Sequence, residues 1–470
     1  AKKVLRRLGR VFHRRLNDTK QAVTAYARVL ALDPENVEAL SALSLLYAKQ
    51  NDSIRAVAVT EKAISLESDQ NRRITLLVQL ASLCEKDGDL RRAANLLGQA
   101  VGEGRRSLQA VGELARFYER HRDTQSRQVL LDTTLALVRE DLVRDPASVD
   151  TLRTVVPLLR WRKRAAGSTA MAQLLITLST DAHERNEISK WAHAPKKGRR
   201  LSSLGNSELD ELTNPVAHIL GLRHVMRLCG PEIAALRKPD LRPFSIGRTQ
   251  RVAPGRGPRT VFDPLAVDLN QKGFELYVSA DHPNALAVEP GDPPAIIIGQ
   301  AWVDAGEVAL RFAAGMTLRL ASTHLDLLAV GRKDEGAALL GAIIREFIPG
   351  YVTLDVEPTL VARFQSKIGR ALSRSMRAEL SPFITEIAGV FDPAALRVEA
   401  LATGARAGLL CCGDLGTALR VLIASVSGTE LRSDGLDPGA LRKNAVAADL
   451  IAFALSSEYE MLVRALDSVS

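Results

Sequence analysis

Residues 22–34 read Ala-Val-Thr-Ala-Tyr-Ala-Arg-Val-Leu-Ala-Leu-Asp-Pro, and this stretch decides the fold of the N-terminal third of the chain. Its pattern, Ala-x3-Tyr-x2-Val-x4-Pro, spaces small and large apolar residues along one face of a helix. Pro34 cannot continue that helix, and Asn36 follows at the place of an N-cap for the next one. We therefore expect residues 22–34 to be the second helix of a helical hairpin.

The pattern recurs along the first 140 residues. Ala22, Ala56 and Ala93 stand at corresponding places, 34 and 37 residues apart, and a weaker fourth copy follows. In the first helix of each copy a small residue allows close approach of its partner helix; these residues are Gly9, Ser44, Ala81 and Ala115. Three positions later stands the residue that fills the space between hairpins: Phe12, Tyr47, Cys84 and Tyr118. Copies of this kind stack into a solenoid, because one hairpin cannot bury its own apolar faces.

These residues resemble the tetratricopeptide repeat family over about residues 3 to 140. The resemblance implies a concave groove that holds a peptide or a helix of another protein. We expect polar side chains of the first helices to line it, namely Arg7, Arg14, Lys49 and Glu85. An alternative is that the groove packs against the chain's own C-terminal half.

Changes in composition divide the chain into three parts. A further pair of apolar helical patterns from Leu152 to Leu178 extends the repeats, so we assign residues 1–190 to the solenoid. A basic linker with one helical stretch occupies residues 191–260, and a helix-rich α+β domain residues 261–470. The predicted fold class is mainly α, with a tetratricopeptide-like α-solenoid followed by the α+β domain.

The formal net charge of +9 is concentrated in the linker. Residues 195 to 260 hold 13 Lys and Arg against five Asp and Glu. The densest part is a basic patch formed by Lys196, Lys197, Arg199 and Arg200. Because aromatic residues for base stacking are nearly absent there, nucleic acid is not the expected partner. A basic regulator that contacts nucleic acid or acidic surfaces stays an alternative.

The sequence pattern changes near Phe274, where the residue types at 274–278 alternate as in a β-strand. Residues 294–299 have the composition of a buried strand, and a helix is expected from about Asp304 to Leu320. This order weakly resembles the core of M48-like zinc metallopeptidases, as in large δ-proteobacterial tetratricopeptide proteins. In that family the helix carries His-Glu-x-x-His, but here Gly315, Met316 and Arg319 occupy these places. Since none of the three can bind zinc or act as a base, the resemblance implies a pseudo-metallopeptidase.

Other catalytic patterns are missing from the sequence. It contains no phosphate-binding G-x-x-x-x-G-K-S/T loop and no G-x-S-x-G nucleophile elbow. We therefore predict no catalytic residue, no metal and no cofactor. The enzyme alternative is a divergent zinc metallopeptidase whose ligands come from His282, Glu307 and His324. The glycines between Gly404 and Gly416 are better explained by close helix packing.

Cysteine usage and hydropathy indicate a cytoplasmic protein. The four cysteines lack metal-binding spacing, so we expect buried, reduced thiols. No stretch has the roughly 18 to 20 apolar residues that span a bilayer. The chain starts without Met inside a helical pattern, which suggests a piece of a longer polypeptide and leaves an upstream targeting segment open. The predicted function is a non-catalytic scaffold that binds proteins through the groove and through a C-terminal interface within a multiprotein assembly.

Overall fold

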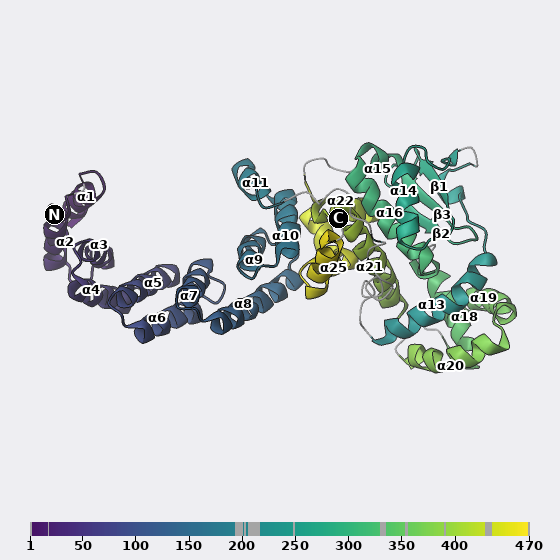
Figure 1. Ribbon diagram of the computed structural model, residues 1–470, viewed down its shortest axis with the longest axis horizontal. Coiled ribbons are helices and arrows are strands. Elements are labelled where there is room, and N and C mark those ends of the chain that lie inside the picture. The colour runs from purple at the N-terminus through teal and green to yellow at the C-terminus, as the bar shows by residue number, and fades with distance from the viewer. Residues whose placement is uncertain are drawn as a thin grey trace. The chain divides into compact units, whose positions relative to one another are not determined.

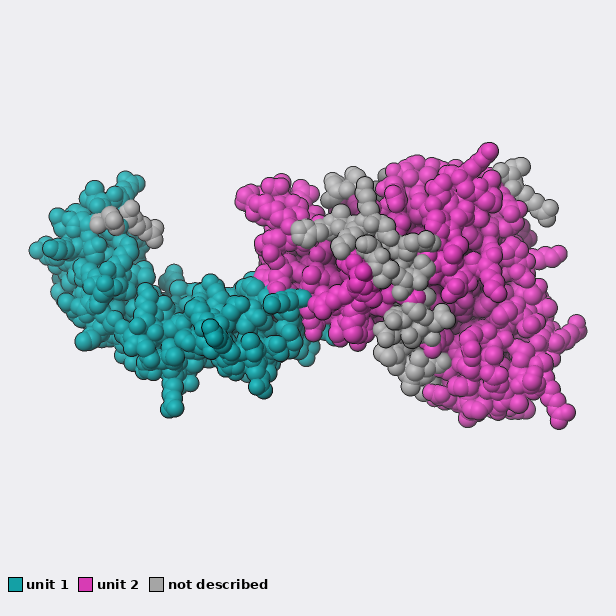
Figure 2. All heavy atoms as spheres, viewed as in Figure 1, with its two compact units in different colours: residues 1–140, 161–163 teal, residues 141–160, 164–470 magenta. Residues whose placement is uncertain are grey.

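The computed structural model describes most of the chain, namely residues 2–16, 18–192, 201, 204, 217–247, 250–329, 335–352, 356–389, 392–427 and 435–468. The chain forms two compact units (Figure 2). Unit 1 comprises residues 1–140 and 161–163, and unit 2 comprises residues 141–160 and 164–470. The basic patch Lys196, Lys197, Arg199 and Arg200 lies outside the described residues.

Unit 1 is a series of antiparallel helical hairpins, as predicted (Figure 1). The first helices of the hairpins are α1 (Lys2–Arg14), α3 (Val37–Lys49), α5 (Gln70–Lys86) and α7 (Leu108–Arg120). The second helices are α2 (Thr19–Leu32), α4 (Ser53–Leu66), α6 (Leu90–Glu103) and α8 (Thr124–Arg144), the last of which continues into unit 2.

The sequence signals for helix ends operate as predicted. Asn36 caps α3, because its side chain accepts a hydrogen bond from the backbone N–H of Ala39 at 3.0 Å. Asp52 caps α4 in the same way, 3.1 Å from the nitrogen of Arg55. The turn before α4 requires one residue in the left-handed backbone conformation, and Asn51 adopts it with φ 57°.

The small residues of the repeat lie at close contacts between the two helices of a hairpin. A Cβ at Gly9 would stand 2.9 Å from the ring of Tyr26, so a larger residue there would displace this ring. In the second hairpin the buried hydroxyl of Ser44 lies 2.5 Å from that of Thr60. The repeat pattern is thus a packing pattern, and its alanines are buried: Ala22, Ala56, Ala63, Ala93 and Ala100.

Unit 2 begins with three helices that the sequence assigned to the repeats. They are α9 (Val149–Trp161, most of which is in the unit), α10 (Ala165–Leu178) and α11 (Ala182–Ser189). The side-chain amide of Gln173 in α10 donates to the carbonyl of Gly413 at 3.2 Å and accepts from the N–H of Leu415 at 2.9 Å. These contacts hold α10 against the C-terminal helices within unit 2, which starts at residue 141.

A small mixed sheet stands at one side of unit 2. Its order is β1-β3-β2, with β1 (Glu275–Ser279) parallel and β2 (Leu286–Glu289) antiparallel to the central β3 (Ala295–Gly299). In register, Tyr277 pairs with Ile297, which also pairs with Ala287. Strand β2 was not predicted, because this segment was assigned to the connection between the other two strands.

The remaining helices come before and after this sheet in the chain. Before the sheet come α13 (Ala217–Ala235), the 3-10 turn η2 (Arg242–Phe244) and α14 (Arg259–Asp268). After it follow α15 (Gln300–Asp304), α16 (Glu307–Ser322), α17 (Asp326–Ala329), α18 (Glu335–Arg345), α19 (Pro358–Ala371) and α20 (Arg374–Gly389). The chain ends in α21 (Pro393–Cys412), α22 (Leu415–Ser427), α23 (Pro438–Lys443), α24 (Ala445–Ala454) and α25 (Ser457–Ser468). Of these helices, α14, α15 and α16 lie beside the sheet, and α13, α18, α19 and α20 lie below it in the view of Figure 1.

Helices α16 and α21 form the tightest helix pair of the core. A Cβ at Gly408 would stand 2.8 Å from the carbonyl oxygen of Phe312, and one at Gly315 would stand 2.6 Å from the sulfur of Cys411. The glycines near residue 408 therefore serve helix packing, as predicted. All four cysteines are buried and free, and burial raises the pKa of Cys411 to about 12.

Candidate protein-binding surface

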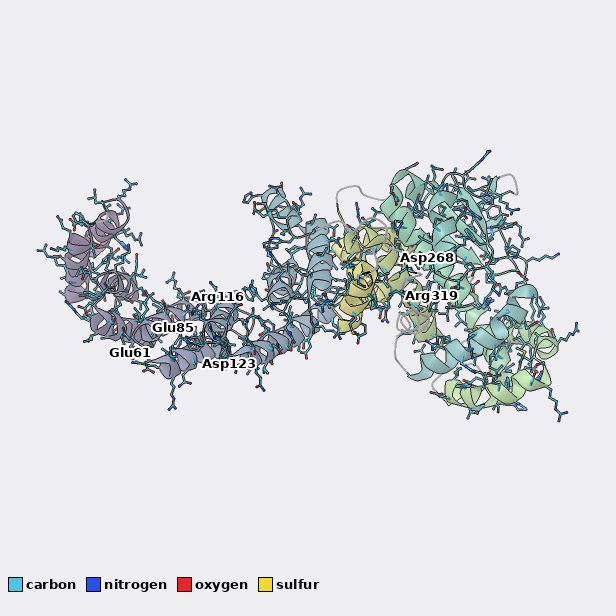
Figure 3. The ribbon with its side chains drawn as sticks, in the orientation of Figure 1. Glu61, Glu85, Arg116, Asp123, Asp268 and Arg319 are labelled. Atoms are coloured by element: carbon cyan, nitrogen blue, oxygen red, sulfur yellow. The ribbon has the colours of Figure 1, made fainter. Side chains whose placement is uncertain are left out.

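The first helices of the hairpins share one side of unit 1. In Figure 1, α1, α3, α5 and α7 follow the inner side of the curve of this unit, and α2, α4 and α6 follow its outer side. Figure 3 shows Glu85 and Arg116 on the inner side, whereas Glu61 and Asp123 lie on the outer side. The inner side is hereafter called the inner surface.

Polar side chains connect each first helix to the next. Arg6 donates to Glu38 at 2.9 Å, and Gln79 donates to Ser44 at 2.5 Å. Further along, Thr75 donates to Gln109 at 3.2 Å. The remaining contacts of this kind are Lys49 with His13 at 3.5 Å and Arg120 with Glu85 at 2.7 Å. Because the repeat length is about 34 residues, one kind of contact recurs from hairpin to hairpin.

Glu85 has the densest set of partners in this series. Its two carboxylate oxygens accept from Arg120 at 2.9 and 2.7 Å, and the ring of His121 lies 2.9 Å away. The hydrogen bond from Arg120 lowers the pKa of Glu85 below its ordinary value. Glu85 therefore links α5 to α7, and its charge is already compensated within the repeats.

The N-terminal end of the inner surface has a surplus of cations. Helix α1 contains six Lys and Arg and no acidic residue. Glu38 is shared by two of them, since both Arg6 and Arg10 pair with it. The hydrogen bond from Arg10 lowers the pKa of Glu38. One carboxylate thus compensates two guanidinium groups, and positive charge is left over at α1.

The four residues predicted to line the groove differ in their surroundings. Arg7 is exposed on α1, and Lys49 is exposed at the end of α3 beside His13. Glu85 is engaged with Arg120 as described above. The side chain of Arg14 lies outside the described residues. Their role in binding stays a prediction.

Several inner residues were missed by the sequence reasoning. These are Arg6, Arg10, Glu38, Gln79 and Arg120, which make the contacts between first helices. A signal for them exists in the sequence, because complementary polar residues recur 32 to 35 positions apart.

Unit 2 does not bring the enzyme alternative's residues together. Among the residues that the structure describes, no group of three or more His, Cys, Asp or Glu side chains could hold a metal ion. His282 lies beside Phe244, Glu307 begins α16, and His324 contacts Gly230. The three residues therefore do not form the expected ligand set.

Within the described part of the chain, no helix is long and apolar enough to cross a membrane.

Comparison with protein families identifies a tetratricopeptide repeat at residues 4–38. This match covers the first hairpin and the start of the next, where the residues of the predicted pattern make their packing contacts. Unit 1 is therefore a solenoid of tetratricopeptide type, followed by a helix-rich α+β unit with a three-stranded sheet. No curated protein matches the chain.

Solved structures of similar fold are tetratricopeptide-type proteins of low identity. MamA is 17% identical, with 40% of this chain and 87% of that chain covered and a TM-score of 0.26. YrrB, described as a tetratricopeptide protein with an unusual peptide-binding site, is 16% identical, with 40% and 90% covered and a TM-score of 0.24. The kinesin light chain repeats of Podospora anserina are 15% identical, with 40% and 96% covered and a TM-score of 0.28.

Proposed function

We propose that this protein is a non-catalytic scaffold whose inner surface in unit 1 binds a segment of another protein. The observation that carries the proposal is the excess of cations at α1, where Glu38 compensates both Arg6 and Arg10 and the remaining basic side chains have no acidic neighbour in their helix. Such a surface favours a segment rich in Asp and Glu, which would pair with exposed side chains such as Arg7 and Lys49.

The architecture supports this function for a physical reason. A solenoid exposes an extended surface whose shape is maintained by contacts between hairpins, so a bound segment does not have to order it. The contacts from Arg120 to Glu85 and from Gln79 to Ser44 hold neighbouring first helices in place. The surface is therefore preorganised, which lowers the entropic cost of binding.

Charge reversal on the two faces of unit 1 tests the proposal. The purified chain of residues 1–470 would be used to capture proteins from the lysate of its native organism at moderate salt. The inner variant is Arg7→Glu with Lys49→Glu, and the matched outer variant is Arg28→Glu with Lys62→Glu on α2 and α4. We expect partners captured by the wild-type chain to be lost with the inner variant and retained with the outer one.

A partner retained equally by both variants would contradict binding at the inner surface. Cross-linking followed by mass spectrometry then locates the partner: cross-links to α1 and α3 support the proposal, whereas cross-links confined to unit 2 point to the second, C-terminal interface of the scaffold. Hydrolysis of added substrates by the purified chain would contradict the non-catalytic part of the proposal.

A further inference from the structure

Unit 2 contains a pocket that the scaffold function does not use. It lies among the first half of α21, the end of α22, α23, the start of α24 and the segment formed by α18 and the residues after it, and it has a volume of about 1430 Å³. Ligand pockets usually measure roughly 300–1,000 Å³. Because its walls come from five segments of the chain, it surrounds a ligand on several sides instead of presenting a flat face.

The described walls of the pocket are mainly aliphatic. They include Val356, Ile423 and Val446, which are buried, and Val398 and Leu401, which are half-buried. At the rim, Val352 is 68% exposed and Val426 is 71% exposed, which leaves apolar surface uncovered. The only aromatic side chain among the described lining residues is Tyr351. An aliphatic ligand therefore suits these walls better than one that needs aromatic stacking.

The two carboxylates at the pocket are engaged with the backbone. Asp392 caps α21 and accepts from the nitrogens of Ala394 and Ala395 at 3.0 and 3.1 Å. Asp437 caps α23 and accepts from the nitrogen of Gly439 at 2.8 Å. Their negative charges thus face the positive ends of two helices, so they are already compensated without a cation from the pocket.

The two cations at the pocket, Arg397 and Lys443, have no such compensation. Both line it, and neither has an ion pair or side-chain hydrogen bond with the described residues. Elsewhere in unit 2, arginines commonly have carboxylate partners, as in the pair of Arg406 with Asp449 at 2.6 Å. The pocket therefore combines an aliphatic interior with two positive charges that have no carboxylate partner among the described residues.

We propose that this pocket binds an amphipathic anion, namely a carboxylate with a long aliphatic chain. The alkyl chain would bury itself against the valine, leucine and isoleucine walls, where each methylene contributes about 0.8 kcal/mol. The carboxylate would pair with Arg397 and Lys443, which supply the donors that a charged head group requires. An extended peptide fits less well, because its backbone amides would lack polar partners on these walls.

Titration calorimetry of the chain with dodecanoate tests the proposal. The dodecanoate concentration is kept below that at which it forms micelles. We expect one molecule to bind per chain, more weakly with decanoate and octanoate. The cationic probe dodecyltrimethylammonium should bind at least about tenfold more weakly, because it has the same chain and the opposite charge. Equal binding of the two probes would overturn the proposal, as would the absence of any dodecanoate binding.

Variants of the cations locate the site. Replacing both Arg397 and Lys443 by alanine should weaken dodecanoate binding by about tenfold or more. The matched control replaces Arg370 and Lys367, exposed on α19, and should leave binding unchanged. Unchanged binding in the first variant would show adsorption elsewhere and would overturn the proposal.

Two substitutions of opposite charge at one rim position distinguish an effect on binding from an effect on folding. Val426 is largely exposed, so either Val426→Glu or Val426→Lys should be tolerated by the fold. Val426→Glu should weaken dodecanoate binding several-fold and Val426→Lys should not, because only the glutamate repels the carboxylate. Equal effects of the two variants would contradict an anion at this rim.

If an acidic amphipathic helix displaced dodecanoate stoichiometrically and bound more tightly, the site would belong to a protein partner, and the proposal of a small-molecule ligand would be overturned.

Discussion

The carboxylate of Glu460 accepts a hydrogen bond from the backbone N–H of Ala166 at 3.0 Å, although 294 residues separate them. It also accepts from the N–H groups of Ala165 and Gly167, at 3.1 and 3.3 Å. These amides begin α10, whose own N-cap residue, Arg164, makes no side-chain capping bond. A buried side chain of α25 thus caps a helix that lies directly after the solenoid in the chain.

Removal of this cap should destabilise the start of α10. For Glu460→Ala we expect a loss of about 1–2 kcal/mol in the free energy of unfolding, because buried amides lose their acceptor. Faster hydrogen exchange at residues 165–167 is the specific readout, since a general loss of stability would not be confined to them. The control Glu232→Ala, at an exposed position of α13, should change neither quantity. Unaltered exchange in Glu460→Ala would show that water replaces the carboxylate without cost.

The sequence predicted the local parts of this fold well. Repeats and caps depend on residues close together in the chain, so Asn36 and Gly9 could be assigned from spacing and residue type. The glycines of α21 were also interpretable, because small residues at helical spacing have few roles other than close packing.

The long-range parts could not be predicted in this way. The cap from Glu460 and the bridge from Gln173 to Gly413 join segments 240 or more residues apart, and no local pattern marks them. Strand β2 has only four residues, which is too short for a clear alternation, and it depends on pairing with Ile298 and its neighbours. The pocket likewise requires five segments to meet before Arg397 and Lys443 acquire a common environment.

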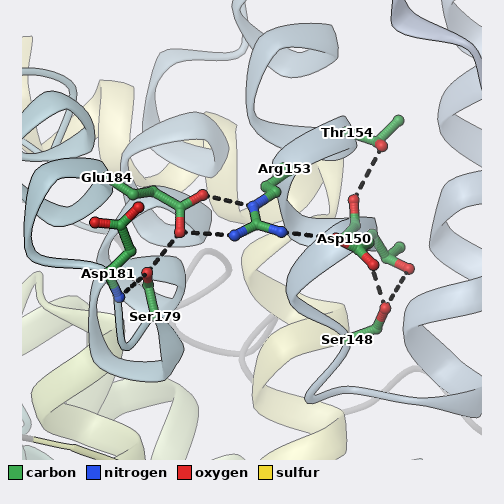
Figure 4. Close-up of polar contacts among 8 residues, drawn as sticks. Ser148, Asp150, Arg153, Thr154, Ser179, Asp181 and Glu184 are labelled. Atoms are coloured by element: carbon green, nitrogen blue, oxygen red, sulfur yellow. Dashed lines mark hydrogen bonds and ion pairs between the residues drawn. The ribbon is translucent and has the colours of Figure 1, made fainter.

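Arg153 stabilises unit 2 through contacts with carboxylates that are lost at acid pH (Figure 4). It donates to Glu184 of α11 at 2.5 and 2.9 Å and to Asp150 at 2.7 Å. The hydrogen bond from Arg153 lowers the pKa of Glu184 from 4.5 to about 2. A depressed folded pKa means that this stabilisation is complete above pH 4.5 and is lost as the pH falls toward 2.

Arg153→Ala should therefore lower the thermal midpoint at pH 7 but have little effect near pH 2. Because Arg153 is half exposed, we expect a cost of only about 1 kcal/mol at pH 7. Thermal unfolding of both chains between pH 2 and pH 7 measures the difference. Arg185→Ala, on the same helix as Glu184, is the matched control. A difference that stays constant across this pH range would exclude Glu184 as the titrating group.

Asp326 should have the opposite pH dependence, because it is almost completely buried at 2% exposure. Its Oδ1 atom has no hydrogen-bond partner among the residues that the structure describes, and burial raises its pKa from 3.8 to about 8. The folded state then keeps a proton that the unfolded state loses above pH 4. Stability from this group consequently falls as the pH rises from about 4 to 8 and levels off above that.

Replacing Asp326 by asparagine removes this titration at similar volume. We expect the variant to be more stable than the wild-type chain by about 1–3 kcal/mol at pH 9 and similar to it at pH 4. Burial also raises the pKa of the neighbouring Glu289 to about 7, so some pH dependence should remain in the variant. Thermal midpoints between pH 4 and pH 9 provide the measurement, with Asp281→Asn as an exposed control. A destabilised variant at pH 9 would show that the ionised carboxylate has a partner in solution.

The close contact between α16 and α21 depends on Gly408. A Cβ at Gly408 would lie 2.8 Å from the backbone oxygen of Phe312, which cannot move without shifting α16. Gly408→Ala should thus destabilise unit 2 by about 1–3 kcal/mol, although alanine favours a helix more than glycine does. The matched substitution Gly369→Ala in α19 meets the carboxylate of Glu346 at 3.4 Å, which is close to ordinary van der Waals contact, and should be neutral or slightly stabilising. Chemical denaturation of both variants decides the matter: if Gly408→Ala were the more stable of the two, the helices would have room to separate, and close packing would not explain the glycine at position 408.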